Sequence, residues 1–585
     1  KNLSINEIYD LAILNYKKGE FESAENLCKK ILSINSNHCE TMFLLGLLSV
    51  RKKKLDSAKK LFTKITKIEI KNVKAYNNLG NVLREMGDNK NAEISFKKVI
   101  EIDPKNTNAL YNIGGIYFSS KKYIDAKNYF EKTIKTQPNF AMAYFSLANV
   151  KVELKDLEGA VNSYNEAIKY NTNFSSSYNN LGLVYRNLNN FDKAIENYKK
   201  AIEIKPHRGG THHNLGLAYK EIGEFDRAID AHNMAIKYEP ENLINYYYLS
   251  ELNKSILNKD LKNKIKKILN KKNLQKRNIA YGNFLLAKYE QSDKKYEDEI
   301  KYLLIAHKNY FDSKLEKFKL GIKYCFEDLM QISKFANTEK NINHKNIILK
   351  PIFIIGVPRC GSTLVEKILA SGENKIPMGE ETAVFENFIN EKIIHKQSLN
   401  LGDTKNLHES LYNIYDKKGL VSKENDYVFT DKSLNNFFYI PIIKNIFPKA
   451  KIIHCKRDLI ASIVSILQNN LTELSWAHDL DNIFKYFNNY LDIMKNNKEK
   501  YNDMIYELDF EKLVDDPESE SKKLMNYCNL KWDKQCLEFY KRKDLISKTA
   551  SNIQIRKAIY KNSEKKYLPY KNILSKYGNK YSWFK

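Results

Sequence analysis

A glycine-bounded loop in the second half of the chain has the composition of an anion-binding site. In "PIFIIGVPRCGSTLVEKIL", residues 351–369, an apolar run leads into Gly356, and Gly361 follows with the spacing of a phosphate-binding loop. Backbone N–H groups at the start of a helix bind anions through fixed dipoles. Ser362 and Thr363 add hydroxyl donors, and Arg359 adds a positive charge. The stretch therefore predicts a site for a phosphate compound.

This loop differs at one position from the loops of enzymes that hydrolyse ATP or GTP. Those loops read G-x-x-x-x-G-K-[ST], where the lysine bridges the β- and γ-phosphates and the Ser or Thr holds Mg²⁺. Here Ser362 replaces the lysine, and we recognise no strand ending in an aspartate that would complete a magnesium site. We therefore expect no metal ion, and keep a phosphotransferase with an atypical loop as an alternative.

A second motif carries another arginine and another hydroxyl group. In "CKRDLIASIVSI", Arg457 ends an apolar run, Asp458 is placed to cap the next helix, and Ser465 lies about two turns along it. A guanidinium and a hydroxyl group bind phosphate through charge-assisted hydrogen bonds. Two such sites suit a nucleotide phosphorylated at two places; the alternative is a surface arginine and an ordinary helix serine.

Strands and helices alternate around these motifs. "PIFIIGV" reads as a buried strand, and the helix after it ends at Gly372; "AKIIHCKRD" reads as a second strand followed by a helix. Such alternation predicts an α/β domain with a parallel sheet, whose ligands bind beyond the carboxyl ends of the strands. Both motifs stand at such ends.

The first half of the chain is a repeat with a period of 34 residues. Two ladders of small residues recur in every period, and prolines fall in the same register: Ala12, Gly46, Gly80, Gly114, Ala148, Gly182 and Gly216; Ala24, Ala58, Ala92, Ala126, Ala160, Ala194 and Ala228; Pro104, Pro138, Pro206 and Pro240.

The ladders have a packing explanation. A small residue on the first helix of each repeat lets the second helix approach closely, and proline ends the second helix because it cannot continue the hydrogen-bond ladder. The pattern resembles the tetratricopeptide repeat over residues 5–242. Such arrays form a solenoid whose concave groove binds a peptide or protein, the alternative being a spacer or a dimerisation arm. Asparagines recur on the first helices, as candidates for bonding a peptide backbone or as solvated side chains: Asn77, Asn78, Asn179, Asn180 and Asn214.

Three regions follow from these patterns. Residues 1–245 are predicted to hold about seven repeats, residues 246–345 a helical connector that includes a helical hairpin, and residues 346–585 the α/β domain. The predicted fold is thus multidomain, with an all-α solenoid before an α/β domain with a central parallel sheet.

Composition limits the class of protein. The chain has 585 residues and a formal net charge of +27, but its lysines are spread throughout and no nucleic-acid-binding motif is present. The seven cysteines show no pattern, which predicts a reducing, cytoplasmic location. We find no signal-peptide core and no apolar run of membrane-spanning length, so no membrane partner is expected. The first residue is Lys1, and the sequence leaves open whether residues precede it.

With both motifs in view, "IFIIGVPRCGSTLVEKIL" and "KRDLIASIVS" resemble the sulfotransferases that use 3′-phosphoadenosine 5′-phosphosulfate (PAPS) and release adenosine 3′,5′-bisphosphate. The resemblance covers residues 346–585 and is nearest to the branch of tyrosylprotein sulfotransferases and bacterial relatives fused to tetratricopeptide repeats. It implies that the first loop holds the 5′-phosphosulfate and that the second motif holds the 3′-phosphate. The implied donor-binding residues in the two motifs are Arg359, Cys360, Gly361, Ser362, Thr363, Leu364, Arg457 and Ser465.

The resemblance also implies catalytic residues. In "MGEET" Glu381 takes the position of the base, with Glu380 in reserve; in "FTDKSLNNF" Lys432 takes that of the catalytic lysine; and Arg359 is the loop arginine. Glu381 would accept the acceptor's proton while Lys432 and Arg359 stabilise developing charge.

Near the C-terminus, "TASNIQIRKAIYKNSEKKY" resembles the segment that covers the donor, which implies donor-binding roles for Ser551 and Lys566. Two positions depart from the family pattern. Cys360 replaces a serine and is expected to act through its backbone, and Phe510 replaces a tyrosine, so a hydroxyl contact to the donor is lost there.

Together these features predict a metal-independent, PAPS-dependent sulfotransferase fused to a partner-binding array. The predicted acceptor is a hydroxyl group, either of a protein tyrosine or of a carbohydrate or small molecule. A non-catalytic nucleotide-binding scaffold is the other alternative. No nucleic-acid partner is expected, and the sequence does not predict the oligomeric state.

Overall fold

The computed structural model describes residues 3–335, 348–394, 404–424, 426–542, 544, 551–559 and 567–584. The chain divides into two compact units, Lys1–Leu215 and Gly216–Lys585, and the division falls inside helix α13 (Gly209–Ile222).

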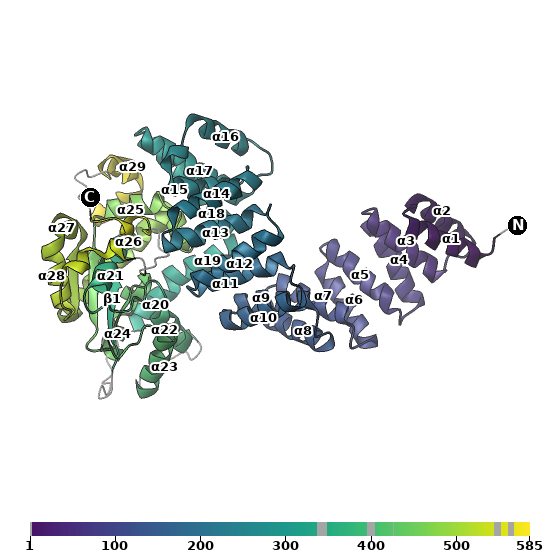
Figure 1. Cartoon of the computed structure of the whole chain (residues 1–585), viewed down its shortest axis with the longest axis horizontal. Helices are drawn as coiled ribbons and strands as arrows, with labels where there is room; N and C mark the ends of the chain where they lie inside the picture. The colour runs from purple at the N-terminus through teal and green to yellow at the C-terminus, as the bar shows by residue number, and fades with distance from the viewer. Residues whose placement is uncertain are drawn as a thin grey trace. The chain divides into compact units, whose positions relative to one another are not determined.

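The first unit consists of helices that follow one another as packed pairs (Figure 1). This confirms the predicted helical solenoid. The first helices of the pairs are α1 (Ile5–Lys18), α3 (Cys39–Arg51), α5 (Val73–Glu85), α7 (Thr107–Ser119), α9 (Ala141–Glu153) and α11 (Ser175–Asn187). The second helices are α2 (Phe21–Ile34), α4 (Leu55–Ile68), α6 (Asn89–Ile102), α8 (Tyr123–Thr136), α10 (Leu157–Tyr170) and α12 (Phe191–Ile204).

The small-residue ladder marks the closest approach within each pair. A Cβ atom added to Gly80 would lie 2.7 Å from the ring of Phe96, on the second helix of the same repeat. Gly114 and Phe130 are placed in the same way. Both rings are buried, so each glycine leaves room for an aromatic side chain that fills the repeat interior.

The second unit opens with helices that continue the array and then depart from it. The predicted hairpin is present as α17 and α18, which pack along each other. The elements of this region are α14 (Phe225–Tyr238), α15 (Leu243–Leu252), α16 (Lys259–Leu269), α17 (Lys276–Ser292), α18 (Tyr296–Ser313), α19 (Leu315–Lys323), a π-helix (Tyr324–Asp328) and α20 (Leu329–Phe335).

A parallel sheet lies at the centre of the rest of this unit. Its order is β2-β1-β3-β4, with β1 (Lys350–Ile355), β2 (Val428–Asp431), β3 (Lys451–Lys456) and β4 (Ile505–Asp509). The sequence indicated β1 and β3, whereas β2 and β4 were not recognised. Two strands end in an aspartate, β2 in Asp431 and β4 in Asp509. The Asp431 carboxylate is buried and accepts hydrogen bonds from Ser433, Asn436 and Tyr415.

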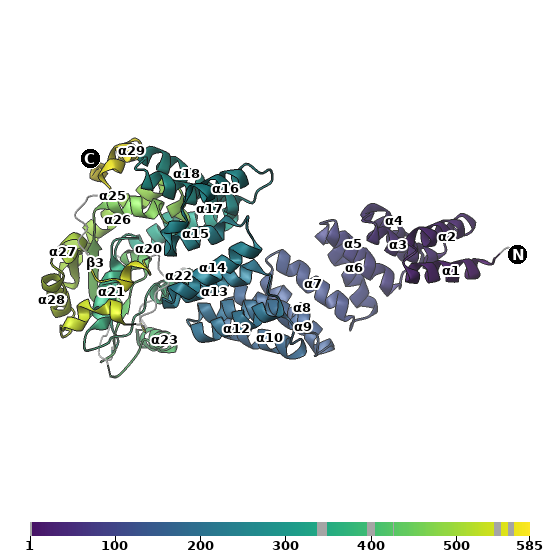
Figure 2. The ribbon, with the colours of Figure 1, turned by 45° about the horizontal axis from the view of Figure 1, so that its top comes forward.

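Helices follow each strand, as the α/β prediction requires. Helix α21 ends at Ser371, just before Gly372, and the Asp458 side chain accepts a hydrogen bond from Ala461 N–H at the start of α25, which confirms both predicted helix boundaries. Helices α27 and α28 lie beside each other, and α29 packs on α25 and α26 (Figure 2). The helices are α21 (Ser362–Ser371), α22 (Val384–Ile394), α23 (Thr404–Lys417), α24 (Ile440–Ile446), α25 (Leu459–Leu467), α26 (Leu480–Tyr501), α27 (Phe510–Asp515), α28 (Pro517–Tyr527) and α29 (Leu568–Gly578).

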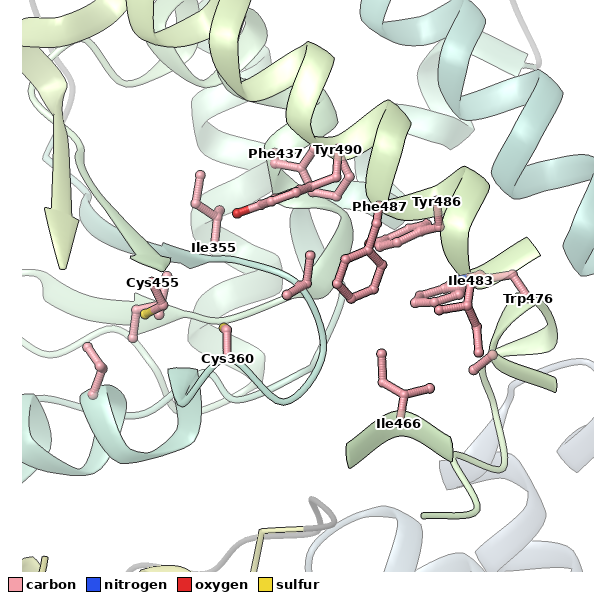
Figure 3. Close-up of a cluster of buried hydrophobic side chains, with 14 of the residues drawn as sticks. Ile355, Cys360, Phe437, Cys455, Ile466, Trp476, Ile483, Tyr486, Phe487 and Tyr490 are labelled. Carbon is pink, nitrogen blue, oxygen red and sulfur yellow. The ribbon is translucent and has the colours of Figure 1, made fainter. Parts of the chain in front are cut away.

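A buried cluster supports the sheet behind the glycine loop (Figure 3). Trp476 stacks on Tyr486 of α26 with ring centroids 3.8 Å apart. Cys360 and Cys455 belong to the same cluster and are buried. All seven cysteines are free. In the described part of the chain, no helix combines the length and apolar character needed to span a bilayer.

Candidate active site

Most of the sequence-predicted residues that the structure describes lie at one edge of the sheet. Because the four strands are parallel, their carboxyl ends lie side by side in the order β2-β1-β3-β4. Lys432 follows β2, the glycine loop follows β1, Arg457 follows β3 and Phe510 follows β4. Each strand is therefore followed by a residue or segment of the candidate site, at the edge where α/β domains bind ligands.

Two residues of the glycine loop, one glycine and one arginine, have a positive φ. Gly361 has φ +98° and directly precedes α21, whereas Arg359 adopts the left-handed region with φ 71°. A Cβ atom on Gly361 would overlap the ring of Phe510. The strained arginine conformation is the kind that tertiary contacts maintain at functional sites.

Arg359 is held by hydroxyl and amide groups from distant parts of the chain. Its Nε donates to Ser465 Oγ at 3.0 Å, and its two Nη atoms donate to Ser551 Oγ at 2.8 Å and Gln554 Oε1 at 3.3 Å. Arg457 donates to the Arg359 carbonyl oxygen at 2.6 Å.

Opposing effects act on the pKa of Arg359. Burial and the nearby Arg457 lower the pKa of Arg359 to about 10, while the carboxylates of Glu251 and Glu381 act in the opposite direction. Arg457 also stacks on Phe510, with its guanidinium carbon 4.9 Å from the ring centroid. Two guanidinium groups thus line the same cavity, which favours an anionic ligand.

A cavity opens at this point of the sheet edge. Seven of the residues predicted to bind the donor line it: Arg359, Gly361, Thr363, Leu364, Arg457, Ser465 and Ser551. Gln554, Phe510, Phe539 and Ile555 complete much of the remaining wall. Among the other predicted residues, Cys360 is buried in the cluster behind the loop, Ser362 is not part of the cavity wall, and Lys566 lies outside the described residues.

Lys432 and Glu381 form an ion pair at the end of β2. The Lys432 ammonium is 3.1 Å from Glu381 Oε1 and 3.9 Å from Glu366 Oε2. Lys432 is 1% exposed, whereas 45% of the Glu381 side chain is exposed. Burial alone would lower the pKa of Lys432, but the carboxylates of Glu381, Glu366 and Glu380 raise it above its ordinary value. Lys432 is therefore a buried ammonium group that stays charged and contacts the exposed carboxylate of Glu381.

Behind this pair lies a set of buried charges. Glu366 and Lys367 sit on α21, and Lys367 Nζ is 3.8 Å from Glu380 Oε1. Burial and the neighbouring Glu366 raise the pKa of Glu380 to about 7, and burial lowers the pKa of Lys367 to about 8. Glu366 Oε1 accepts hydrogen bonds from Thr430 Oγ1 and from Glu380 N–H. The set ties α21 to the segment that carries Glu381.

The "MGEET" segment is aligned along β2 by backbone pairing. Thr430 N–H donates to the Pro377 carbonyl and Lys432 N–H to the Glu380 carbonyl, both at 3.0 Å. A Cβ atom on Gly379 would overlap the Thr430 carbonyl, so the glycine permits this close contact. Glu380 has φ 45°. The pairing brings Glu381 beside Lys432, which is fifty-one positions away.

Several residues at the site were not predicted. Gln554 contacts Arg359, Glu366 lies beside Lys432, and Lys367 lies beside Glu380. A signal for Glu366 and Lys367 was present, because "STLVEKILAS" places an acid and a base next to each other among mostly apolar residues. The contact of Gln554 has no comparable local signal.

The described histidines of this domain lie elsewhere. His478 is buried and its Nδ1 lies 2.9 Å from His307 Nδ1, His454 contacts Tyr490 and Glu507, and the His408 ring packs near Phe447. None of these four histidines lines the cavity. His395 falls outside the described residues.

The first unit contains a hollow lined by amide side chains. Its walls are Lys74, Asn77, Asn78, Asn81, Asn108 and Asn112. Asn112 accepts from Arg84 at 2.6 Å and donates to Asn81 at 3.2 Å. Farther along, three of the predicted asparagines bond one another in a chain that ends at Asn149: Asn214 to Asn179, Asn179 to Asn180 and Asn180 to Asn149.

Known families match segments in both halves of the chain. The model of the sulfotransferase family matches residues 351–534. Models of the tetratricopeptide repeat match residues 73–106, 107–140, 148–188, 175–208 and 211–244.

Individual relatives cover only part of the chain. An uncharacterised protein of Aquifex aeolicus (strain VF5) is 34% identical over 243 residues, which are 39% of this chain and 31% of that protein, so the chain spans less than a third of its length. The crystal structure of MamA is 32% identical with a TM-score of 0.27, covering 28% of this chain and 95% of MamA. YrrB, described as a tetratricopeptide repeat protein with an unusual peptide-binding site, is 22% identical with a TM-score of 0.29, covering 32% of this chain and 96% of YrrB. The family matches show that this chain combines a sulfotransferase-family domain with an array of tetratricopeptide repeats.

Proposed function

We propose that the chain is a PAPS-dependent sulfotransferase that transfers a sulfuryl group to an acceptor hydroxyl. The observation that carries the proposal is the cavity at the carboxyl edge of the sheet, which Arg359 and Arg457 both line. The Lys432–Glu381 pair at the end of the neighbouring strand supplies groups for the chemistry.

The residues of the cavity fit a doubly phosphorylated adenosine. The N-terminus of α21, Thr363 and Arg359 offer donors for one anionic group, and Arg457 and Ser465 offer donors for another. Phe510, Phe539 and Ile555 offer apolar surface for a base. Bound PAPS would supply the activated sulfuryl group, with adenosine 3′,5′-bisphosphate as the leaving group. Ser551 and, by resemblance, Lys566 belong to the same proposed site.

Glu381 is the proposed general base. Its carboxylate is the accessible member of the ion pair, so an acceptor hydroxyl can reach it, and Lys432 keeps it oriented. One positioned base contributes about 10²–10⁴ in rate. Glu380 fits this role less well, because its carboxylate turns inward toward Lys367. Lys432 and Arg359 are the proposed groups that stabilise charge developing on the transferred group.

The proposed acceptor is a protein tyrosine, with a carbohydrate or a small hydroxylated molecule as the alternative. The resemblance to tyrosylprotein sulfotransferases supports a tyrosine, and the amide-lined hollow supports a polypeptide partner in the array. Asparagine side chains offer a donor and an acceptor that match a peptide group. Within the described residues, the buried Asn77 Oδ1 has no hydrogen-bond partner. The predicted cytoplasmic location is kept as part of this proposal.

Donor binding provides the first test. Adenosine 3′,5′-bisphosphate should raise the melting temperature of the full chain without Mg²⁺, and ATP with Mg²⁺ should have little effect. The opposite result would favour a phosphotransferase and contradict the proposal.

Transfer of labelled sulfate from PAPS to tyrosine peptides, oligosaccharides and simple phenols then tests activity and acceptor class. Glu381→Gln should lower kcat by about 10²–10⁴ while product binding is retained. Glu380→Gln is the matched variant and should lose less. A chain that binds the product and transfers sulfate to no acceptor would be a scaffold.

A peptide series tests the role of the array. If the hollow binds main-chain groups, longer tyrosine peptides should have a lower KM than short ones, and Asn77→Ala should remove part of that difference. A KM that is independent of peptide length in both chains would contradict peptide binding by the array.

A further inference from the structure

We propose that Asn552 and Arg556 are positioning residues that fix one wall of the donor cavity to the end of helix α13, so that the last complete repeat sets donor affinity. The inference rests on the proposed function. We name residues 551–559 the roof segment, because Ser551, Gln554, Ile555, Lys557, Ala558 and Ile559 line the cavity.

The roof segment is bonded to the C-terminal end of α13. The Glu221 carbonyl accepts hydrogen bonds from Asn552 Nδ2 at 3.1 Å and from Arg556 Nη2 at 3.3 Å. Arg556 Nε also donates to Asn552 Oδ1 at 3.4 Å. The last carbonyls of a helix lack partners within the helix and attract cations. At α13, Asn552, which is 3% exposed, supplies a hydrogen-bond donor to such a carbonyl, and Arg556 supplies a donor and a positive charge.

The roof segment also contacts Arg359. Ser551 and Gln554 accept hydrogen bonds from the Arg359 guanidinium. Gln554 N–H and Ile555 N–H both donate to the Ser551 carbonyl, so residues 551–556 form one compact turn. A displacement of Asn552 and Arg556 would therefore move the partners of Arg359 as well.

Gly223 leaves the space that Arg556 occupies. Its φ is +86°, and a Cβ atom on it would overlap the Arg556 guanidinium. The turn after the first helix of a repeat does not itself require glycine. At equivalent places, 34 residues apart, the left-handed residue is Lys53, Lys121, Lys155 or Asn189. At Gly87, which is also equivalent, a Cβ atom would meet nothing within 4 Å.

Helix α15 also acts on Arg359. Glu251 of α15 forms an ion pair with Lys220 of α13 at 2.5 Å. Its carboxylate raises the pKa of Arg359, against the effect of burial. Elements at the end of the array thus contribute to the donor site through the roof segment and through Arg359 directly.

Gly223→Asn is the decisive variant, because asparagine is accepted in this turn at Asn189 but would displace Arg556. Binding of adenosine 3′,5′-bisphosphate to the full chain is measured by calorimetry, and KM for PAPS and kcat are measured separately. We expect Kd and KM to rise roughly tenfold with kcat little changed, which is the loss expected when a charge-assisted hydrogen bond is disrupted. Asn552→Ala should act in the same direction, and Arg556→Lys should bind product better than Arg556→Ala.

Gly87→Asn is the matched control and should leave Kd, KM and kcat unchanged. Product binding that is equally tight in wild type, Gly223→Asn and Asn552→Ala would overturn the assignment. A fall in kcat with unchanged KM would also overturn it. A wild-type chain that binds no product would overturn the proposed function and this inference with it.

Discussion

The repeat array and the sheet edge reach their structures through contacts of very different range. In the array, Gly80 packs on Phe96 of the neighbouring helix, and the same arrangement recurs in later repeats. At the sheet edge, Arg359 bonds Ser465 and Ser551, which are 106 and 192 positions away. The first pattern repeats along the chain and is visible in it, whereas the second exists only after folding.

The two regions also bury different chemistry. The interior of the repeats is built from alanine, aliphatic and aromatic side chains, as in the cluster around Phe62, Phe96 and Val99. The sheet edge buries Glu366, Lys367, Lys432 and Asp431 almost completely. Buried charges cost free energy unless they are paired, so such residues are retained where function needs them. Substitutions should therefore affect stability in the array and chemistry at the edge.

The largest expected effect is at Lys432. Lys432→Ala should lower the rate of sulfate transfer by about 10³, because the group that stabilises developing charge and orients Glu381 is lost. Initial rates with labelled PAPS measure this, and circular dichroism checks folding, since Glu366 would lose a cationic partner. Lys449→Ala, at an exposed lysine just before β3, is the control and should retain full activity. A fully active Lys432→Ala chain would contradict the expectation that substitutions at the sheet edge affect chemistry.

A pH titration should reveal the buried imidazoles of the second unit. Burial lowers the pKa of His307 to about 4, from an ordinary value of 6.5. Between pH 4 and 6.5 the unfolded state therefore binds a proton more readily than the folded state does. The free energy of unfolding is unaffected by this imidazole above pH 6.5 and falls by about 3 kcal/mol as the pH drops toward 4. Urea unfolding between pH 4 and 7.5 measures this. His307→Gln should remove part of the dependence, the rest coming from the buried His478, whose pKa is also lowered. His207→Gln, at an exposed position, should leave the dependence unchanged. An unchanged slope in His307→Gln would refute the assignment.

The adjacent residues Gly114 and Gly115 test the packing of the repeat array. A Cβ atom on Gly114 would lie 2.7 Å from the Phe130 ring, whereas one on Gly115 would meet nothing within 4 Å. Gly114→Ala should destabilise the first unit by about 1–2 kcal/mol through overpacking. Gly115→Ala should stabilise it by about 0.5–1 kcal/mol through helix propensity. Hydrogen exchange of α7 and α8 in the full chain measures both, and equal effects of the two substitutions would contradict the packing account.

The smallest expected effect concerns the hydroxyl that holds Arg359. Ser465→Ala removes one hydrogen bond to the guanidinium and should weaken binding of adenosine 3′,5′-bisphosphate by about fivefold. Ser462→Ala, on the same helix but with a buried hydroxyl that does not line the cavity, is the control. Calorimetry distinguishes the two, and equal affinities would remove Ser465 from the proposed donor site.

The sequence predicted most of the fold but only part of the site. The period of 34 residues and the two strand-loop-helix motifs identified the solenoid and β1 and β3. Strands β2 and β4 were missed because each is only four or five residues long and includes polar residues, as in "VFTD" and "IYELD". Gln554, Asn552 and Arg556 were missed because their partners lie on remote elements.

Local chemistry in the sequence determined the periodic packing, the helix boundaries at Gly372 and Asp458, and the presence of two anion-binding motifs. These features depend on neighbours within a helix or between successive helices, so residue type and spacing are sufficient. Tertiary structure decided how Glu380 and Glu381, which are chemically equal neighbours, are oriented. The backbone pairing with β2 turns Glu380 toward Lys367 in the interior and leaves Glu381 exposed beside Lys432. That orientation depends on a strand about fifty residues away, and no local pattern encodes it.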